Sequence, residues 1–504
     1  MNTTAEKLQP APIGRKRATL ALVIGGYVNT AILIVQGLLL IPLYLHFIGA
    51  HLYGIWMASG GILGMLGVIN FGISNMLVQR IANAYGQKDL SKAGAYFVNG
   101  MFVYLIIVCL FISIGFLLSF FFLALLKVPS ELNNLLRGCF QLAVIAAGAG
   151  IINECLRGFA QALLRPVFSM IAIAASRVFG IAITIMLLYK NAGLWAIPVG
   201  MIVAETFILI AALIQSATLF RELHTKVAID GVIVKEYFSQ GGAIFMAKLG
   251  SALSRESDPL MITFFLRPEL TTAYMLTRKA ADIVFQMLSV IYGASHSAFS
   301  HLVGNGDQDK IAEIATKLLM MVFVLGLIGF VPYVMMNHTF VALWVGEVFA
   351  LNQMIILMIG IAFFANSLRN MVWQMLNGFG DYQYSSRIIF IEGVAKVILA
   401  VVLLHFIGMP GVPLAMVVTS IISMVALVVK LQSHVKLTIS KRELSYAFAM
   451  VITLFALSGY YSGTVHAATW IKFVLFSGMV VIGVTILCVL SNWTKFKILI
   501  KDYL

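Results

Sequence analysis

Residues 102–126 read FVYLIIVCLFISIGFLLSFFFLALL, a run of 25 residues without a charged side chain. A helix needs about 20 mainly apolar residues to cross the hydrocarbon core of a bilayer. The whole chain shares this character, since 61% of its 504 residues are hydrophobic and only 11% are charged. A typical soluble domain has roughly 25% charged residues. The sequence therefore excludes a soluble enzyme, a disordered chain and a disulfide scaffold, and predicts an all-α, polytopic integral membrane protein.

Fourteen segments have the length and composition of membrane spans, and their connections are too short to hold a folded catalytic domain. They lie near residues 19–46, 52–78, 95–126, 138–163, 167–189, 194–219, 238–266, 271–300, 313–336, 352–380, 385–406, 411–432, 446–463 and 468–490. The first segment is too long for a signal peptide, and we interpret it as an uncleaved transmembrane helix.

The net charge of +14 is explained by topology. With both termini in the cytoplasm, most Lys and Arg residues outside the segments fall on the cytoplasmic side, as the positive-inside rule requires. A nucleic-acid partner is therefore not needed. The sequence has no Cys/His cluster with ligand spacing and no nucleotide-binding motif, so we expect neither a metal nor a cofactor.

An internal repeat is indicated at an offset of about 220 residues. Gly86–Asp89 and Gly306–Asp309 are both G-x-x-D turns, and Leu156–Phe159 and Leu376–Phe379 both end a predicted span. Both halves begin on the cytoplasmic side, and parallel repeats of this kind are a transporter architecture. We predict a cytoplasmic tail, two pseudo-symmetric six-helix lobes, two further helices and a second cytoplasmic tail, at residues 1–18, 19–219, 220–432, 433–490 and 491–504.

Charged residues inside the predicted spans are the main functional candidates, because each costs roughly 2.5–3.5 kcal/mol to insert. Some have a partner of opposite sign one turn away on the same helix, which favours mutual neutralisation. In the second half of the chain these predicted pairs are Arg255 with Asp258, Arg278 with Asp282, and Glu392 with Lys396.

Other basic residues lack a nearby partner, namely Arg177, Lys248, Lys279 and Arg369. Together with Arg255 they predict a cationic, water-filled cavity that binds an anionic substrate, because charge-assisted contacts to phosphate are strong. Salt bridges between helices that cancel these charges remain the alternative.

The seventh predicted span is interrupted by the polar run Ser254–Pro259. Proline removes a backbone hydrogen bond and kinks a helix, so Pro259 predicts a break that serves as a hinge and gate. Glu256, Asp258 and Glu205 are the candidates for carrying a coupling proton or cation. The alternative is a helix packed against the eighth span with its charges paired.

Several short motifs resemble the Wzx-type polysaccharide flippases of the multidrug/oligosaccharidyl-lipid/polysaccharide (MOP) exporter superfamily. They are Leu52-Tyr53-Gly54-Ile55-Trp56, Asn70-Phe71-Gly72-Ile73, Arg80-Ile81-Ala82, Asp258 and Ala273-Tyr274. The resemblance covers most of the chain and agrees with the predicted arrangement of six, six and two helices.

The resemblance implies a non-enzymatic flippase in the bacterial cytoplasmic (inner) membrane. Its substrate would be an undecaprenyl-pyrophosphate-linked oligosaccharide for O-antigen lipopolysaccharide, capsule or exopolysaccharide, moved to the outer leaflet by alternating access. An H+ or Na+ gradient, or removal of the product, would supply the energy. Polysaccharide polymerase and chain-length machinery are the implied protein partners.

Other functions stay open from sequence alone. A drug or cation antiporter and a lipid II flippase belong to the same superfamily, although the surplus of unpaired intramembrane cations argues against the former. A membrane polysaccharide polymerase or ligase would need catalytic residues in a long outer loop. The longest outer loop here, about Asn337 to Leu351, has no obvious acid/base pair.

Overall fold

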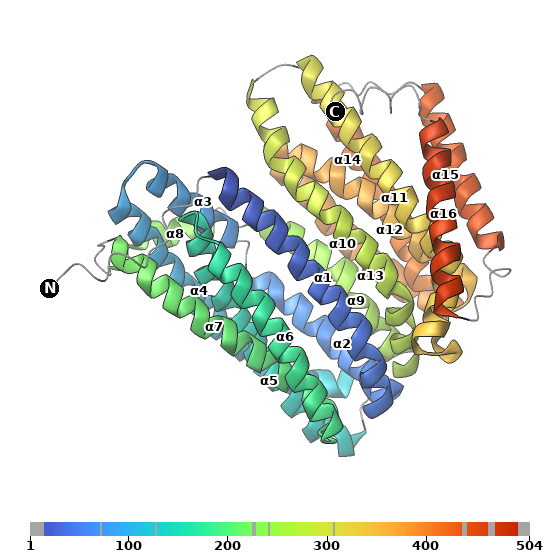
Figure 1. Cartoon of the computed structure of the whole chain (residues 1–504), viewed down its shortest axis with the longest axis horizontal. Coiled ribbons are helices and arrows are strands. Elements are labelled where there is room, and N and C mark those ends of the chain that lie inside the picture. Colours follow the sequence, from blue (N-terminus) through green and yellow to red (C-terminus); the bar gives the residue numbers. More distant parts are fainter. Residues whose placement is uncertain are drawn as a thin grey trace. The chain divides into compact units, whose positions relative to one another are not determined.

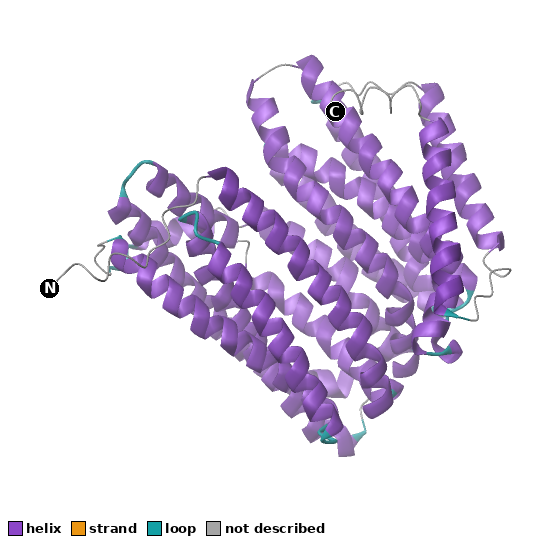
Figure 2. Cartoon of the chain, viewed as in Figure 1, coloured by secondary structure: helices purple, strands orange, loops and turns teal. Residues whose placement is uncertain are grey.

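The structure is a computed structural model, and it describes residues 15–70, 73–125, 129–223, 228–239, 242–305, 308–435, 441–461 and 469–491. Within these ranges every regular element is a helix (Figures 1 and 2). This follows from the bilayer, in which a spanning segment must satisfy its backbone hydrogen bonds internally. The prediction of an all-α, polytopic membrane protein is confirmed. The predicted turn Gly306–Asp309 lies partly outside the described residues.

The helices of the first half run from α1 to α8. They are α1 (Arg15–Phe47), α2 (Ala50–Leu66), η2 (Gly67–Asn70), α3 (Ile73–Gly86), α4 (Leu90–Leu125), α5 (Ser130–Ala162), α6 (Val167–Tyr189), η3 (Gly193–Trp195), α7 (Ala196–Glu222) and α8 (Gly231–Ser239). Those of the second half are α9 (Gly242–Phe265), α10 (Pro268–Asn305), α11 (Gln308–Val345), η4 (Glu347–Phe349), α12 (Gln353–Gly378), α13 (Tyr382–Ile407), α14 (Gly411–Gln432), α15 (Lys441–Tyr461) and α16 (Trp470–Ser491).

Eleven stretches of the described residues are long and apolar enough to cross a membrane. The helices α9, α10 and α15 are not among them. Four charged residues fall within α9, and the apolar part of α15, Ala449–Tyr460, is short. The second predicted span, 52–78, is also not one helix. A 3-10 turn at Gly67–Asn70 follows α2 and precedes α3.

The chain forms two compact units, Met1–Lys248 and Leu249–Leu504. In the first unit α5 packs on α4 and α7, and α7 also packs on α6. In the second, α12 packs on α11 and α14, and α14 also packs on α13. The same pattern of neighbours within each unit supports the predicted duplication, and the residue ranges predicted for the lobes stay a prediction.

Two glycines let α9 and α13 approach each other closely in the second unit. A Cβ atom on Gly250 would overlap the backbone at Ile389, and one on Gly393 would overlap the backbone of Gly250. Small residues permit such backbone contact between membrane helices. This crossing places the charged side chains of α9 and α13 within reach of each other.

Candidate functional site

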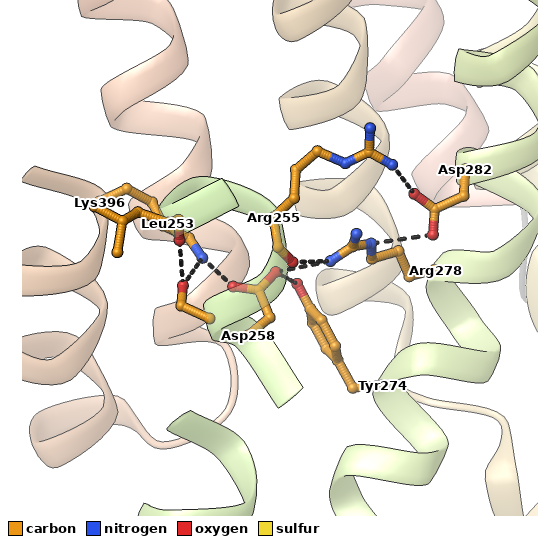
Figure 3. Close-up of polar contacts among 8 residues, drawn as sticks. Leu253, Arg255, Asp258, Tyr274, Arg278, Asp282 and Lys396 are labelled. Carbon is orange, nitrogen blue, oxygen red and sulfur yellow. Dashed lines mark hydrogen bonds and ion pairs between the residues drawn. The ribbon is translucent and has the colours of Figure 1, made fainter. Parts of the chain in front are cut away.

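Asp258 is the centre of a buried ion-pair network in the second unit (Figure 3). Its side chain lies on α9 and is 0% exposed. One carboxylate oxygen accepts from the ammonium of Lys396 on α13. The other accepts from Arg278 Nη1 at 3.0 Å and from the Tyr274 hydroxyl at 3.3 Å, both on α10. A single carboxylate thus joins three helices.

The network extends from Arg278 along α10. Arg278 Nε lies 3.1 Å from Asp282 Oδ2, and Arg255 Nη2 of α9 lies 3.5 Å from Asp282 Oδ1. On the other side Lys396 also donates to the hydroxyl of Ser257 at 3.2 Å. The ammonium and the guanidinium therefore each have more than one acceptor, as buried charges require.

Pro259 lies inside α9 and affects this network through its missing N–H, while its predicted role as a hinge and gate stays a prediction. The helix α9 is continuous through Pro259, so the predicted interruption of the helix is wrong. Proline lacks the N–H that would bond the carbonyl four residues earlier, at Arg255. Arg278 Nη1 donates to that carbonyl at 3.2 Å and satisfies it instead. The guanidinium replaces the missing helix bond and ties α10 to the free carbonyl.

A second buried pair lies between α12 and α13. Arg369 Nη1 donates to Glu392 Oε2 at 2.7 Å, and both side chains are less than 10% exposed. The Ser420 hydroxyl of α14 donates to the other Glu392 oxygen at 3.3 Å. Asn366, one turn before Arg369, accepts from Arg369 Nε at 3.1 Å. This pair connects α12 and α14 to α13, which also carries Lys396 of the first network.

These contacts change several predicted pairings. The pair of Arg278 with Asp282 is confirmed. The predicted pair of Arg255 with Asp258 is wrong, because Arg255 contacts Asp282. Asp258 is instead in ion pairs with Arg278 of α10 and Lys396 of α13.

The remaining two corrections concern α12 and α13. Glu392 does not pair with Lys396, since Lys396 bonds Asp258 and Glu392 bonds Arg369. The expectation that Arg369 lacks an acidic partner is therefore also wrong. For these residues the alternative expectation, salt bridges between helices, is correct. The packing of neighbouring helices determines the partners here, and the spacing along a single helix does not.

The sequence reasoning missed Lys396 and Arg278 as partners of Asp258, and Ser257 as a partner of Lys396. The available signal was the pair of close-approach glycines. Ser257 follows Gly250 by two helical turns, and Lys396 follows Gly393 by three residues, so each lies on the same helix face as its glycine. Glycine is common in membrane helices, and the signal is readable only once the α9–α13 contact is known.

The other predicted cations have a different setting. Arg177 on α6, Lys248 on α9 and Lys279 on α10 are half-buried, and among the described residues they take part in no ion pair. Charge-assisted bonds to an anion are thus open to these three side chains. Two members of the predicted cationic set, Arg255 and Arg369, are in ion pairs with acidic residues.

The three predicted coupling acids lie in different surroundings. Glu205 on α7 accepts from Asn153 Nδ2 of α5 at 2.7 Å, in the first unit. Glu256 is half-buried on α9, and Arg278 and Arg255 are the basic groups that act on it most strongly. With Glu256 included, each basic side chain of the network is matched by an acidic one. Asp258 is the only one of these acids that is fully buried and shared between helices within the described part of the chain.

Solved structures of transporters have the same fold as this chain. The lipid II flippase MurJ in an inward closed conformation has a TM-score of 0.64 at 12% identity, covering 96% of this chain and 99% of that one. An inward-facing multidrug resistance MATE transporter of the MOP superfamily has a TM-score of 0.57 at 15% identity, covering 86% and 95%. At these identities the likeness shows the fold alone.

A third similar structure is a MOP superfamily transporter from Pyrococcus furiosus, described by a reverse polarity of its binding pocket. Its TM-score is 0.61 at 13% identity, covering 83% of this chain and 95% of that one. No curated protein sequence matches the chain.

A family model described as polysaccharide biosynthesis protein matches residues 20–303, which is more than half of the chain. The match includes most of the first unit and, in the second unit, the α9 and α10 parts of the ion-pair network. It agrees with the motifs that resemble polysaccharide flippases. The chain, a multi-pass membrane protein with the fold of MOP transporters, belongs to the polysaccharide biosynthesis protein family.

Proposed function

We propose that this protein is a flippase of undecaprenyl-pyrophosphate-linked oligosaccharide repeat units. It would move them from the cytoplasmic to the outer leaflet of the bacterial cytoplasmic membrane for surface polysaccharide synthesis. The observation that carries the proposal is the family match over residues 20–303 in a chain with the fold of MOP transporters. The protein would act without covalent chemistry, a metal or a cofactor, in the pathway of a polymerase and its chain-length machinery.

Asp258 is our candidate for the coupling group. A proton taken up from the gradient would neutralise its carboxylate and so remove the counterion of Lys396 and one of the two counterions of Arg278. The helices α9, α10 and α13 would then favour a different packing, since a bound ion shifts a conformational equilibrium by its differential affinity for the two states. Na+ is the alternative ion, with Glu256 and Glu205 as the other candidate carboxylates and Pro259 as the neighbouring hinge position.

The half-buried cations Arg177, Lys248 and Lys279 are our candidates for contacts with the pyrophosphate and acidic sugars. Arginine and lysine both form strong charge-assisted hydrogen bonds with phosphate oxygens. Arg255 is 37% exposed despite its contact with Asp282, so it keeps donors free for a ligand. Arg369 forms an ion pair with Glu392, so it would act by holding α12 and α13 together.

A drug or cation antiporter is the second candidate function. The observation that favours it is the balance of charge in the ion-pair network, which offers an anionic substrate less positive charge than the sequence alone predicts. A lipid II flippase is a further alternative with the same fold.

The experiment is a deletion strain analysed for lipid-linked oligosaccharides and surface glycan. The proposal predicts loss of surface polysaccharide, with repeat units held on undecaprenyl pyrophosphate in the inner leaflet. Normal surface glycan with new sensitivity to cationic drugs would favour the antiporter. Arrest of peptidoglycan synthesis would favour lipid II as the substrate. Single repeat units accumulating in the outer leaflet would indicate a failed polymerase step and contradict transport.

A further inference from the structure

A pocket lies at one end of the α3–α4 hairpin of the first unit. It is lined by Arg80, Asn83, Ala84, Gln87, Lys92 and Tyr96. The polar side chains of this lining are two cations, two amides and a phenol, and there is no carboxylate among them. All of these polar groups can donate hydrogen bonds. Such a set is suited to an anion with several acceptor oxygens.

The two cations of the pocket keep donors free. The Arg80 guanidinium forms an ion pair with Glu236 of α8, which engages part of its five-donor fork and fixes its position. Asp89 accepts from the backbone N–H of Lys92 at 2.9 Å and so caps the start of α4. The Lys92 ammonium itself is in no ion pair among the described residues.

The short helix α8 is anchored to α4 beside this pocket. The Tyr237 hydroxyl donates to the carbonyl oxygen of Tyr96 at 3.1 Å. The fully buried Asn99 accepts from the backbone N–H of Asp230 at 2.7 Å and donates to the Ala228 carbonyl at 3.3 Å. The side chain of Arg80 on α3 is therefore held by an ion pair to α8, and α8 is in turn anchored to α4.

Apolar side chains are exposed just before α8 and in its first turn. Ile229 is 60% exposed and Val232 is 77% exposed. A short helix with exposed apolar residues next to basic ones is typical of the bilayer interface. The predicted topology places this end of α3 and α4 at the cytoplasmic surface, where lipid headgroups lie.

We propose that this pocket binds the phosphate group of a membrane lipid in the cytoplasmic leaflet. Arg80 and Lys92 would contact the phosphate oxygens, Asn83, Gln87 and Tyr96 would donate further hydrogen bonds, and the apolar start of α8 would lie beside the acyl chains. Basic pockets between membrane helices at this level bind anionic headgroups. The lipid is either a bulk anionic phospholipid or the lipid-linked oligosaccharide itself, and only the second assignment rests on the proposed function.

The test measures lipid binding to the purified full-length protein in detergent by native mass spectrometry. The probes are phosphatidylglycerol, phosphatidylcholine, undecaprenyl pyrophosphate and inorganic phosphate. The variants are Lys92→Gln and Gln87→Glu, both of exposed pocket residues, and the matched control is Lys88→Gln, an exposed lysine of the same turn outside the lining. Unchanged melting temperatures would exclude misfolding.

We expect about tenfold weaker binding of the anionic lipids to Lys92→Gln, a larger loss for Gln87→Glu, and a change under about twofold for Lys88→Gln. Tighter binding of undecaprenyl pyrophosphate than of phosphatidylglycerol would identify the substrate lipid, and equal binding would identify a general phospholipid site. Equal effects at Lys92 and Lys88, no effect at Lys92, or equally tight binding of phosphatidylcholine or inorganic phosphate would overturn the proposal. No transport is measured, so the proposed function can fail independently.

Discussion

The two units organise buried polar groups in different ways, although their helices pack in the same pattern. In the second unit Asp258 joins α9, α10 and α13 through ion pairs. In the first unit the carboxylate of Glu205 accepts from the amide of Asn153, and Arg177 is in no ion pair among the described residues. Helix packing alone therefore does not determine the charge pattern. We therefore expect the second unit to depend more than the first on charge pairing for its stability.

The connections at one end of the units show a related difference. After α5, Arg165 forms an ion pair with Glu222 of α7 at 2.8 Å. After α12, Asp381 forms an ion pair with Lys430 of α14 and a hydrogen bond with His434, both at 3.1 Å. Each unit thus ties the same kind of connection to its neighbouring helix, with the signs of the charges exchanged.

Replacement of Asp258 by asparagine is expected to have the largest effect. Lys396 would stay charged without an acidic partner, Arg278 would keep only Asp282, and the loss of one partner of a buried pair costs about 3–5 kcal/mol. The measurement is chemical denaturation in detergent. The double variant D258N/K396M should recover a large part of the loss, because it removes the orphaned ammonium as well. A single-variant cost below about 1 kcal/mol would refute the dependence of the second unit on charge pairing.

Arg369→Met is expected to destabilise the protein by about 3 kcal/mol, at the lower end of that range. Glu392 would lose its cation but keep the hydrogen bond from Ser420 at 3.3 Å. The combination with E392Q provides the double-mutant cycle, and additive effects of the two substitutions would show that the pair is not coupled.

Glu205→Gln should cost only about 1 kcal/mol, because a neutral hydrogen bond from Asn153 replaces a charge-assisted one. The same denaturation experiment measures it. A loss as large as that of D258N would erase the contrast between the units and show that the first unit also depends on a buried charge.

Asp381→Asn is expected to have the smallest effect and to change only the response to acid. Burial raises the pKa of Asp381, but hydrogen bonds from His434 and Lys430 outweigh it and hold the pKa below its ordinary value. A lowered folded-state pKa stabilises the fold above the unfolded value of about 3.9, and this contribution is lost as the pH falls through the folded-state pKa. Melting temperatures of the wild type should therefore fall more steeply than those of D381N below about pH 5. Parallel curves would mean that the pair contributes nothing.

Most of the fold was predictable because apolar length and charge are local properties of the sequence. Of the apolar run at residues 102–126, residues 102–125 lie in α4 (Leu90–Leu125). The motifs around Trp56 agree with the family. The 3-10 turn Gly67–Asn70 was not visible, since its residues continue the apolar character of α2. Hydropathy does not distinguish a continuous helix from one that changes its winding.

The ion pairs were predictable only within single helices. The pair of Arg278 with Asp282 follows from a spacing of four residues, but Lys396 is 138 residues from Asp258 in the chain. Its choice of partner depends on the crossing of α9 and α13, a tertiary contact that no local spacing encodes. For the same reason Pro259 was predicted to break α9, whereas Arg278 supplies the missing hydrogen bond from another helix.

The most direct test of the account is a translocation assay in proteoliposomes containing the purified wild type or the folded D258N/K396M variant. The readout is the amount of fluorescent undecaprenyl-pyrophosphate oligosaccharide that becomes protected from an external quencher under an imposed proton gradient. We predict gradient-dependent translocation by the wild type and none by the double variant, although both are folded. Equal translocation by the two proteins would show that the pair of Asp258 and Lys396 serves stability alone and would contradict its role in coupling.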